Sequence, residues 1–379
     1  MSIYVVNTGD NVDGIAENHG VSVWRIIEDN QLLYPYELAV GQALLIRDGN
    51  AVGSGREIVS NGYAYPFISP WVLEQTLPYL SELSVFSYGF TPEGELIPPQ
   101  LDDQWMIDTA RRFGARPILT LTPLNAEGRF DNSLITAVVW DLPSRERLIS
   151  NLLIVMEEKG YQGLDIDFEY ILEQDRDLFS QFVRVCAEAM QRMGYTLSVA
   201  LAPKTSADQP GLLYAGKDYR ALGAAADSVL LMTYEWGYTY GPPMAVAPLN
   251  KVRQVVEYAI TEIPPEKINL GIPNYGYDWP LPFVQGETKA KTIGNIEAVR
   301  IAVSYGAEIQ FDETAQSPFF RYYDRSGVEH EVWFEDVRSL QAKFDLIDEF
   351  NLRDPGYWQI MQLFRANWLL LAERFRILK

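Results

Sequence analysis

Three carboxylates alternate with apolar residues between positions 163 and 170, in the string GLDIDFEY. Side chains on a strand alternate between its two faces, so Asp165, Asp167 and Glu169 share one face and the apolar residues share the other. Three acids on an inward face are costly unless they share protons or fix a charge on a substrate. The string therefore predicts an acid–base site, although a solvated edge strand or a cation site would show the same alternation.

The scarce residue types exclude several other chemistries. The chain has one cysteine, Cys186, and two histidines, His19 and His330, which lie far apart in the sequence. A single thiol cannot close an intramolecular disulfide, and no Cys/His set fits a structural zinc site or a zinc-peptidase helix. We therefore expect no metal and no cofactor, and a chemistry based on carboxylates, tyrosines and amides.

Charge and hydropathy narrow the classes of partner. The 379 residues carry a formal net charge of −20, and no stretch is rich in Lys and Arg, so we expect neither nucleic acid nor an anionic membrane surface as a partner. No apolar stretch approaches the ~20 residues that span a bilayer. The N-terminus lacks the pattern of a secretory signal, which predicts synthesis in the cytoplasm.

Eight short apolar runs follow residue 61, and amphipathic stretches such as Arg145–Lys159 separate most of them. The runs are Tyr63–Phe67, Leu83–Tyr88, Pro117–Leu121, Leu164–Phe168, Leu197–Leu201, Ser228–Tyr234, Ile268–Ile272 and Gly356–Ile360. This alternation predicts an α/β fold, a (β/α)8 TIM barrel, whose fourth strand carries the acids toward the C-terminal rim where barrel active sites lie. A doubly wound sheet is the alternative, but its glycine fingerprint does not follow the first strand.

Two further segments divide the chain. Residues 48–56 are glycine-rich and predict a linker between a module at 1–47 and a large domain at 57–379. Residues 286–335 are too long for a loop between strands 7 and 8, and predict a small α/β insertion there. The spacing of Gly211, Gly216 and Lys217 mimics a phosphate loop, but Asp218 follows it and no strand precedes it, so we treat the match as chance.

The first 47 residues predict strand, helix, helix and strand, a βααβ unit too small for a catalyst and suited to binding. They resemble a LysM domain, which binds N-acetylglucosamine-containing glycans. The resemblance rests on Tyr4-Val5-Val6, Thr8-Gly9-Asp10, Ile15-Ala16, Val21-Ser22 and Leu38-x-Val40-Gly41-Gln42-x-Leu44-x-Ile46. It implies that glycan lies between two loops, Gly9, Asp10 and Asn11 in one and Leu32, Leu33 and Tyr34 in the other. The family usually has Ser or Thr near Asn11, so this chain departs from it there.

The acidic string resembles the D-x-x-D-x-D-x-E signature of glycoside hydrolase family 18, the chitinase-like barrels, with Gln162 in place of the first Asp. Further motifs agree in order and spacing: Met232-Thr-Tyr234, Gly271-Ile-Pro-Asn-Tyr275-Gly-Tyr277-Asp-Trp279 and Tyr357-Trp358 at the ends of strands six to eight. The tail Asn367-Trp368-Leu-Leu-Leu371, with the LysM-like module, resembles the branch of spore-cortex peptidoglycan N-acetylglucosaminidases.

The resemblance implies roles for the matching residues. The family uses no carboxylate nucleophile; the 2-acetamido oxygen of the substrate attacks the anomeric carbon, with net retention. Glu169 would be the general acid and then the general base. Asp167 would orient the acetamide, Asp165 would share a proton with it, and Tyr234 would donate its hydroxyl to the acetamide oxygen. Trp358 would form an apolar floor under the sugar ring.

Other residues at strand ends are candidate sugar contacts. Glu235 stands where the family has Asp and reaches one methylene further toward a sugar hydroxyl, whereas Gln162 is expected to lie behind the acids and tune them. The aromatic candidates for stacking on sugar are Tyr88, Trp236, Tyr275, Tyr277 and Trp279.

These observations favour a retaining glycosidase that hydrolyses β-linked N-acetylglucosamine in peptidoglycan, with a LysM module that docks it. The alternative from another functional class is a non-catalytic glycan-binding or coat protein on the same barrel. Such a protein would be expected to have lost Glu169, which is present in this chain. Chitin hydrolysis is the third reading and differs only in substrate. The resemblance implies deposition on the spore. Oligomeric state and endo or exo cleavage stay open.

Overall fold

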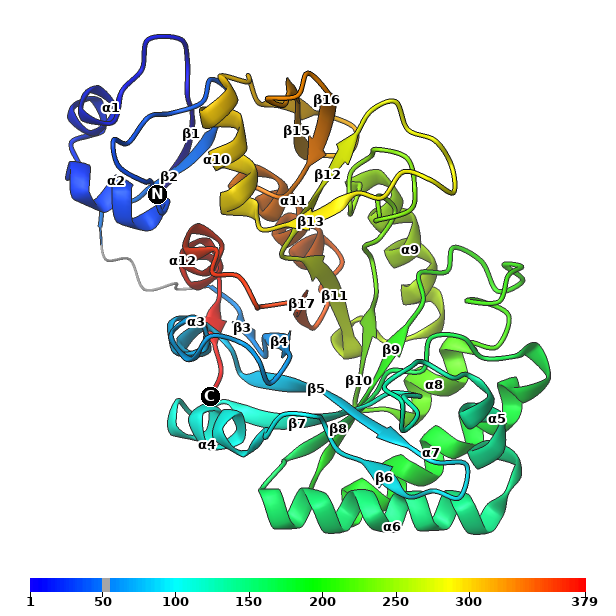
Figure 1. Cartoon of the computed structure of the whole chain (residues 1–379). Coiled ribbons are helices and arrows are strands. Elements are labelled where there is room, and N and C mark those ends of the chain that lie inside the picture. Colours follow the sequence, from blue (N-terminus) through cyan, green and yellow to red (C-terminus); the bar gives the residue numbers. More distant parts are fainter. Residues whose placement is uncertain (50–54) are drawn as a thin grey trace.

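The computed structural model describes residues 1–49 and 55–379, so residues 50–54 of the predicted linker lie outside the described residues. A small N-terminal module lies beside a barrel with an added sheet (Figure 1). No helix within the described ranges is long and apolar enough to cross a membrane.

Eight parallel strands close into a barrel, which confirms the predicted TIM-barrel fold. Each predicted run contributes a strand, and the last strand, β17, pairs with the first, β4, to close the ring. The strands in barrel order are β4 (Asn61–Ala64), β5 (Glu82–Phe90), β7 (Arg116–Leu121), β8 (Gly163–Ile166), β9 (Thr196–Leu201), β10 (Ser228–Leu231), β11 (Ile268–Pro273) and β17 (Asp354–Trp358). A short strand, β6 (Leu96–Ile97), pairs antiparallel with the end of β5.

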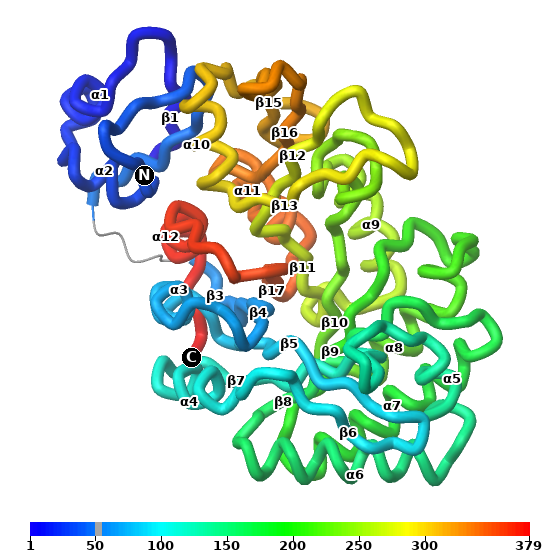
Figure 2. The backbone as a smooth tube through the Cα atoms, viewed as in Figure 1, coloured from blue at the N-terminus to red at the C-terminus, as the bar shows by residue number. Residues whose placement is uncertain are grey.

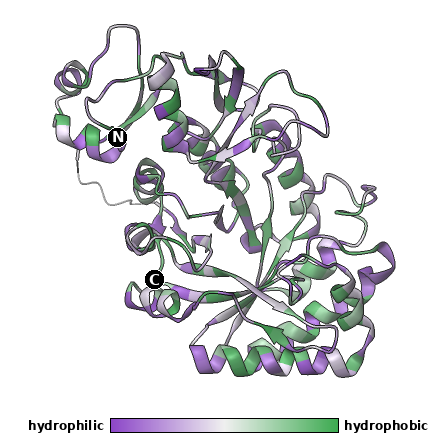
Figure 3. Ribbon diagram, viewed as in Figure 1, coloured by the Kyte–Doolittle hydropathy of each residue, from purple (hydrophilic) through white to green (hydrophobic). Residues whose placement is uncertain are grey.

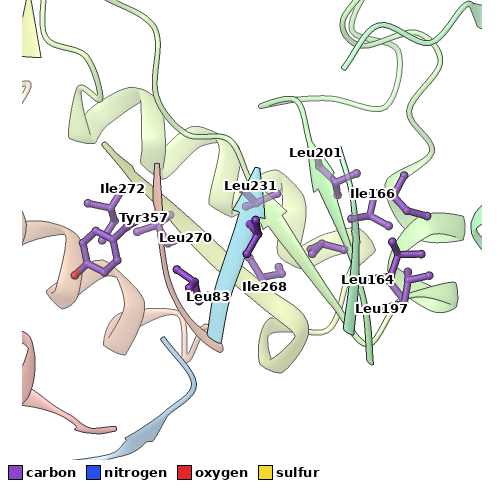
Figure 4. Packing of buried hydrophobic residues seen from close by; sticks show 14 of the residues in the cluster. Leu83, Leu164, Ile166, Leu197, Leu201, Leu231, Ile268, Leu270, Ile272 and Tyr357 are labelled. Carbon is purple, nitrogen blue, oxygen red and sulfur yellow. The ribbon is translucent and has the colours of Figure 1, made fainter. Parts of the chain in front are cut away.

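Alternation along each strand divides the barrel into an apolar outside and a more polar inside. Leu164 and Ile166 of β8 are fully buried in the main core, together with their counterparts on neighbouring strands (Figure 4). Asp165, between them, faces the opposite way and accepts hydrogen bonds from Tyr63 of β4, across the barrel, and from Ser198 of the neighbouring strand β9. Burying one face of every strand fixes the register, because a slip of one residue would bring the acids among the aliphatic side chains.

A ring of helices covers the apolar outside. The helices are α3 (Pro70–Thr76), α4 (Gln104–Arg112), α5 (Ser133–Trp140), α6 (Leu142–Lys159), α7 (Arg176–Arg192), α8 (Tyr219–Ala225), α9 (Leu249–Glu262), α11 (Val337–Glu349) and α12 (Arg365–Arg374). Helix α6 shows why the sequence forms them: Asp141 caps its start, Gly160 ends it in the left-handed conformation, and hydrophobic residues alternate with hydrophilic ones along it (Figure 3). The C-terminal strand β18 (Arg376–Ile377) pairs with β3 (Glu57–Ile58), which ties the end of the chain to the segment before the barrel.

An insertion lies between β11 and β17, as predicted, but it begins earlier than residue 286. A five-stranded antiparallel sheet and one helix form it. Its elements are β12 (Gly276–Pro280), β13 (Lys291–Ile293), α10 (Asn295–Tyr305), β14 (Gln310–Asp312), β15 (Ser317–Tyr323) and β16 (Glu329–Trp333). The motif spacing predicts Tyr277 and Trp279 at the end of the seventh strand, whereas β11 ends at Pro273 and both residues belong to the insertion.

The N-terminal module has the predicted βααβ order: β1 (Ser2–Val5), α1 (Val12–His19), α2 (Val23–Asp29) and β2 (Ala43–Ile46). The side chain of Asn11 caps α1 by accepting from Gly14 N. Ser22 precedes α2 without a side-chain capping bond in the described part of the chain. The module packs beside α10 and α12 (Figure 2).

Backbone contacts fix the module against the insertion. The amide of Ile309 donates to the carbonyl of Val40 at 2.8 Å. Gly41 has φ +81°, and a Cβ there would lie 1.8 Å from the carbonyl oxygen of Ile309. Only glycine allows this approach, so the module and the insertion are in direct backbone contact here.

Candidate active site

The three predicted acids climb along the fourth barrel strand to its C-terminal end. Asp165 lies within β8, whereas Asp167 and Glu169 follow the last strand residue, Ile166. Asp165 and Asp167 are buried and Glu169 is half-buried. The acids therefore lie at the end of the barrel where active sites of this fold occur.

Asp165 is the deepest acid, and neutral donors hold it. The hydroxyl of Ser198 donates to its Oδ1 at 2.5 Å and the hydroxyl of Tyr63 to its Oδ2 at 3.0 Å. Burial raises the pKa of Asp165 to about 6, although both hydrogen bonds act in the opposite direction. Asp165 therefore binds a proton more readily than an exposed aspartate does.

Asp167 has an open hydrogen-bonding position. Its Oδ1 is buried and has no hydrogen-bond partner among the residues that the structure describes. Burial, followed by the charges of Glu169 and Asp165, raises the pKa of Asp167 well above its usual range. An unpaired buried carboxylate oxygen is expensive, which indicates that a ligand group with an N–H or O–H completes this site.

Glu169 lies at the outer end of the acidic series. Burial raises the pKa of Glu169 above its ordinary value, and the positive charge of Lys217 opposes that rise. A carboxyl with a raised pKa that still reaches the solvent is suited to donate a proton and later to accept one.

Lys217 is a residue of this site that the sequence analysis missed. Its side chain is fully buried, and its Nζ donates to the carbonyl oxygens of Phe168, between the two outer acids, and Ala200. Burial lowers the pKa of Lys217 to about 8, while Asp167 and Glu169 act to keep it charged. Only the chance resemblance to a phosphate loop marked this residue in the sequence, and no sequence pattern links it to Asp167 and Glu169, which lie 50 and 48 positions before it.

Tyr234 follows β10 and lies close to the acids. The ring fits because residue 271 is glycine: a Cβ there would lie 2.9 Å from Cε1 of Tyr234. Burial, and then the charge of Asp167, raises the pKa of Tyr234 well above its usual range. The hydroxyl therefore stays protonated and can donate a hydrogen bond.

Aromatic rings surround the half-buried Trp358 at the end of β17. Its ring lies 4.9 Å from Phe86, 5.8 Å from Tyr63 and 6.0 Å from Tyr65, measured between centroids, with edges meeting faces. These three neighbours hold the indole in place. The sequence analysis did not name them as site residues, although Tyr63, Tyr65 and Phe67 alternate at the end of the first strand as the acids do on the fourth.

Glu235 is held by two tyrosines. Tyr275 donates its hydroxyl to Oε1 of Glu235, and Tyr277 donates to the same carboxylate at 2.9 and 3.1 Å. The rings of Tyr275 and Tyr277 are buried, so they position Glu235 rather than offer a face for stacking. Glu235 itself is exposed and has a positive φ of 66°.

The structure corrects the predictions for Tyr88, Trp279 and Gln162. Tyr88 is buried in the main core because the register of β5 shifts between Val85 and Tyr88, which turns its side chain toward the helices. Trp279 is fully buried, and its Nε1 donates to the carbonyl of Gly241. Gln162 is exposed at the start of β8, at the opposite end of the strand from Glu169. Trp236 is half-buried against the main core, and its contact with a ligand stays a prediction.

Tyr88 has a structural role, which a substitution can test. Its hydroxyl donates to Asp103 at 2.7 Å, and the same carboxylate accepts from Tyr161 and pairs with Lys159. We expect Tyr88→Phe to lower the free energy of unfolding by about 1–2 kcal/mol, because a buried carboxylate loses one donor. Urea unfolding measures this. Tyr161→Phe removes the second donor and should cost a similar amount; unchanged stability of both variants would contradict the assignment.

The predicted LysM contacts lie on two loops. Asp10 accepts from the hydroxyl of Tyr4 and the amide of Asn7, both at 2.7 Å, so its carboxylate already has partners. Gly9 turns the chain with φ +90°, and Asn11 caps α1. In the other loop Leu32 is half-buried, whereas Leu33 and Tyr34 are 53% and 84% exposed. Leu33 and Tyr34 therefore remain accessible to a ligand.

Within residues 1–49 and 55–379, no group of three or more His, Cys, Asp or Glu side chains is arranged to hold a metal ion. The site instead consists of three neighbouring carboxyl groups, the buried ammonium of Lys217, the hydroxyl of Tyr234 and the aromatic ring of Trp358. Such a site can protonate a leaving group and stabilise a cation that develops next to Asp167.

Comparisons with known proteins agree with this geometry. The sequence profile of the glycosyl hydrolases family 18 matches residues 128–362, and that of the LysM domain matches residues 4–47. The cortical fragment-lytic enzyme of Bacillus subtilis (strain 168) is 37% identical in an alignment 431 positions long, which covers 100% of this chain and 99% of the relative. The putative sporulation-specific glycosylase YdhD of the same organism is 34% identical, covering 100% of this chain and 89% of the relative. The crystal structure of the spore cortex-lytic enzyme SleL of Bacillus megaterium QM B1551 superposes with a TM-score of 0.93 at 33% identity, covering 100% of this chain and 98% of that one.

Proposed function

We propose, from the premise that this chain belongs to the glycosyl hydrolases of family 18 and carries a LysM domain, that it cleaves spore-cortex peptidoglycan at N-acetylglucosamine. The chain is a glycoside hydrolase, and its relatives of similar length are named for lysis of the cortex and its fragments. The retaining, substrate-assisted course is part of the proposal.

The buried Oδ1 of Asp167, which has no hydrogen-bond partner in the part of the chain that the structure describes, carries the proposal. In the proposed mechanism this atom accepts the N–H of the 2-acetamido group and turns the acetamide oxygen toward the anomeric carbon. Asp165 lies behind Asp167 with a pKa of about 6 and can share its proton. Tyr234 donates to the acetamide oxygen, and Trp358 lies under the sugar ring.

Glu169 completes the reaction. It protonates the glycosidic oxygen as the acetamide oxygen attacks, and it then removes a proton from the water that opens the cyclic intermediate. Two displacements at one carbon return the original configuration, so the first product should be the β-anomer.

Defined cortex fragments test the proposal. Mass analysis of the products should show chains that end in reducing N-acetylglucosamine, and NMR of fresh digests should show the β-anomer first. Products that end in reducing muramic acid would overturn the bond assignment, and an initial α-anomer would overturn retention. Faster turnover of chitin oligomers would make chitin the substrate, whereas binding without turnover at every pH would favour a non-catalytic glycan-binding protein.

The tyrosine pair around Glu235 gives a prediction about substrate affinity. We expect the double variant Tyr275→Phe/Tyr277→Phe to raise KM about fivefold to tenfold with a smaller change in kcat, because the released Glu235 no longer meets a sugar hydroxyl in a fixed position. Steady-state kinetics on soluble cortex fragments measures both constants. If Glu235→Gln leaves KM unchanged, Glu235 does not contact the substrate.

We infer that the protein is deposited on the spore. The support is the names of the relatives, which refer to sporulation and to the spore cortex. Fractionation of spores and mother-cell cytosol with an antibody against the chain tests the inference, and protein confined to the cytosol of sporulating cells would contradict it.

A further inference from the structure

A cavity of about 250 Å³ lies where the LysM domain meets the insertion. One wall is the LysM segment from Asn30 to Pro35, which includes the predicted glycan contacts Leu32, Leu33 and Tyr34. The opposite wall is helix α10 with the turn between β16 and α11. The described residues Gly9, Asp10 and Asn11 of the other LysM loop do not line this cavity.

Two buried polar atoms of residues in this wall lack a hydrogen-bond partner among the residues that the structure describes. Asn295 accepts from the amide of Glu335 through its Oδ1 at 2.9 Å, and its Nδ2 finds no partner in residues 1–49 and 55–379. Glu335 accepts from Lys343 at 2.8 Å through Oε2, whereas its Oε1 is likewise without a partner in those ranges. Asn295 and Glu335 are 3% and 1% exposed, and both line the cavity. Buried polar groups are normally hydrogen-bonded, so one free donor and one free acceptor on two residues that line the same cavity point to a ligand.

The chemistry of this pair fits an acetamide. An acetamide group presents one carbonyl acceptor, for Nδ2 of Asn295, and one N–H donor, for Oε1 of Glu335. The volume is below the roughly 300–1,000 Å³ of sites for drug-sized molecules, which suits a single sugar residue. At the mouth, the exposed side chains of Leu33 and Tyr34 offer apolar surface for the C–H face of a pyranose.

We propose that this cavity is a second glycan site, in which the LysM domain and the insertion together hold one N-acetylated sugar residue of a glycan strand. It rests on the proposed function for the identity of the glycan. The contacts of Val40 with Ile309 and of Gln31 with Arg365 hold the two walls in place before the ligand arrives.

The position of the cavity explains how such a site would serve the barrel. A groove continues from it past Asn295 and Arg300 to Trp71 and Asn274. The amide of Asn274 donates to the carbonyl of Trp358, the residue under the proposed catalytic subsite. The groove therefore ends at a residue that is hydrogen-bonded to the proposed floor of the active site.

The test uses the full chain with Glu169→Gln, which binds without turnover, and a chitin tetramer as the probe. Hydrogen–deuterium exchange at increasing tetramer concentration gives a separate dissociation constant for the α10 segment and for the segment after β8. We expect the tetramer to protect both segments. In this background, Val299→Trp fills the cavity and Asn295→Leu removes the free donor, and each should weaken protection of α10 at least about tenfold. Tyr305→Phe, on the same helix but outside the linings of both the cavity and the groove, is the matched control and should change nothing.

Val299→Trp keeps the inference falsifiable if Asn295→Leu fails to fold, because it leaves the bond from Glu335 N to Asn295 intact. No protection of α10 in the parent, or protection of α10 in a folded Val299→Trp protein within twofold of the parent, would overturn the second site. If the wild-type chain does not hydrolyse cortex fragments but the tetramer still protects α10 in the Glu169→Gln chain, the proposed function is overturned and the second site stands.

Discussion

Replacement of Glu169 by glutamine is expected to lower kcat by about 10²- to 10⁴-fold, the range for loss of a general acid. Glutamine has nearly the same shape and keeps a hydrogen-bonding side chain, so we expect the Kd for cortex fragments to change little. Burial raises the pKa of Glu169 in the folded chain, so the ionised form opposes folding and stability falls as pH rises through that pKa. The uncharged glutamine removes this penalty, and the variant should melt no lower than wild type at pH 7.

Two measurements separate this result from a loss of structure. Kinetics on cortex fragments gives kcat, and thermal unfolding on the same samples gives stability. Glu173→Gln, a change of the same kind at the start of the next helical turn, is the control and should retain activity. Product release by Glu169→Gln at the wild-type rate would rule out Glu169 as the acid.

The sequence predicted the barrel and the acidic series because both depend on local patterns. Alternation places Leu164 and Ile166 on the helix side and Asp165 on the inner side, and the structure has this arrangement. The module at the N-terminus was readable for the same reason, since Asn11 and Gly20 mark the two ends of α1.

The sequence did not predict the orientation and burial of residues whose positions depend on irregular backbone or on packing between distant segments. The aromatic ring of Tyr88 at a strand end predicts a sugar contact, but the register shift in β5 turns its side chain into the main core. Trp279 belongs to a sheet of the insertion whose start the sequence did not mark. In both cases the type of residue suggested a sugar contact, while the burial that excludes it arises only in the folded chain.

Lys217 is the plainest case of a tertiary effect. It lies in a segment without regular structure before α8, and the fold brings its ammonium beneath the strand end that carries Asp167 and Glu169. Lys204 is a second buried lysine nearby, and its Nζ donates to the carbonyls of Lys217 and Ala207. Only the first of the two affects the pKa of the acids, which provides a matched pair of variants.

Replacement of Lys217 by methionine is expected to move the whole pH–rate profile to higher pH and to lower kcat about tenfold to a hundredfold at the wild-type optimum. The ammonium lowers the pKa of both Asp167 and Glu169, so its removal raises both. The acidic limb requires an ionised carboxylate beside the acetamide, and the alkaline limb requires a protonated Glu169, so both limbs shift in the same direction. Lys204→Met loses a buried lysine of the same kind and should cost stability without moving the profile, whereas Lys217→Arg keeps the charge and should restore part of the wild-type position. Measured pH profiles of kcat/KM that coincide for wild type and a folded Lys217→Met protein would show that the buried charge does not set the proton affinity of the acids.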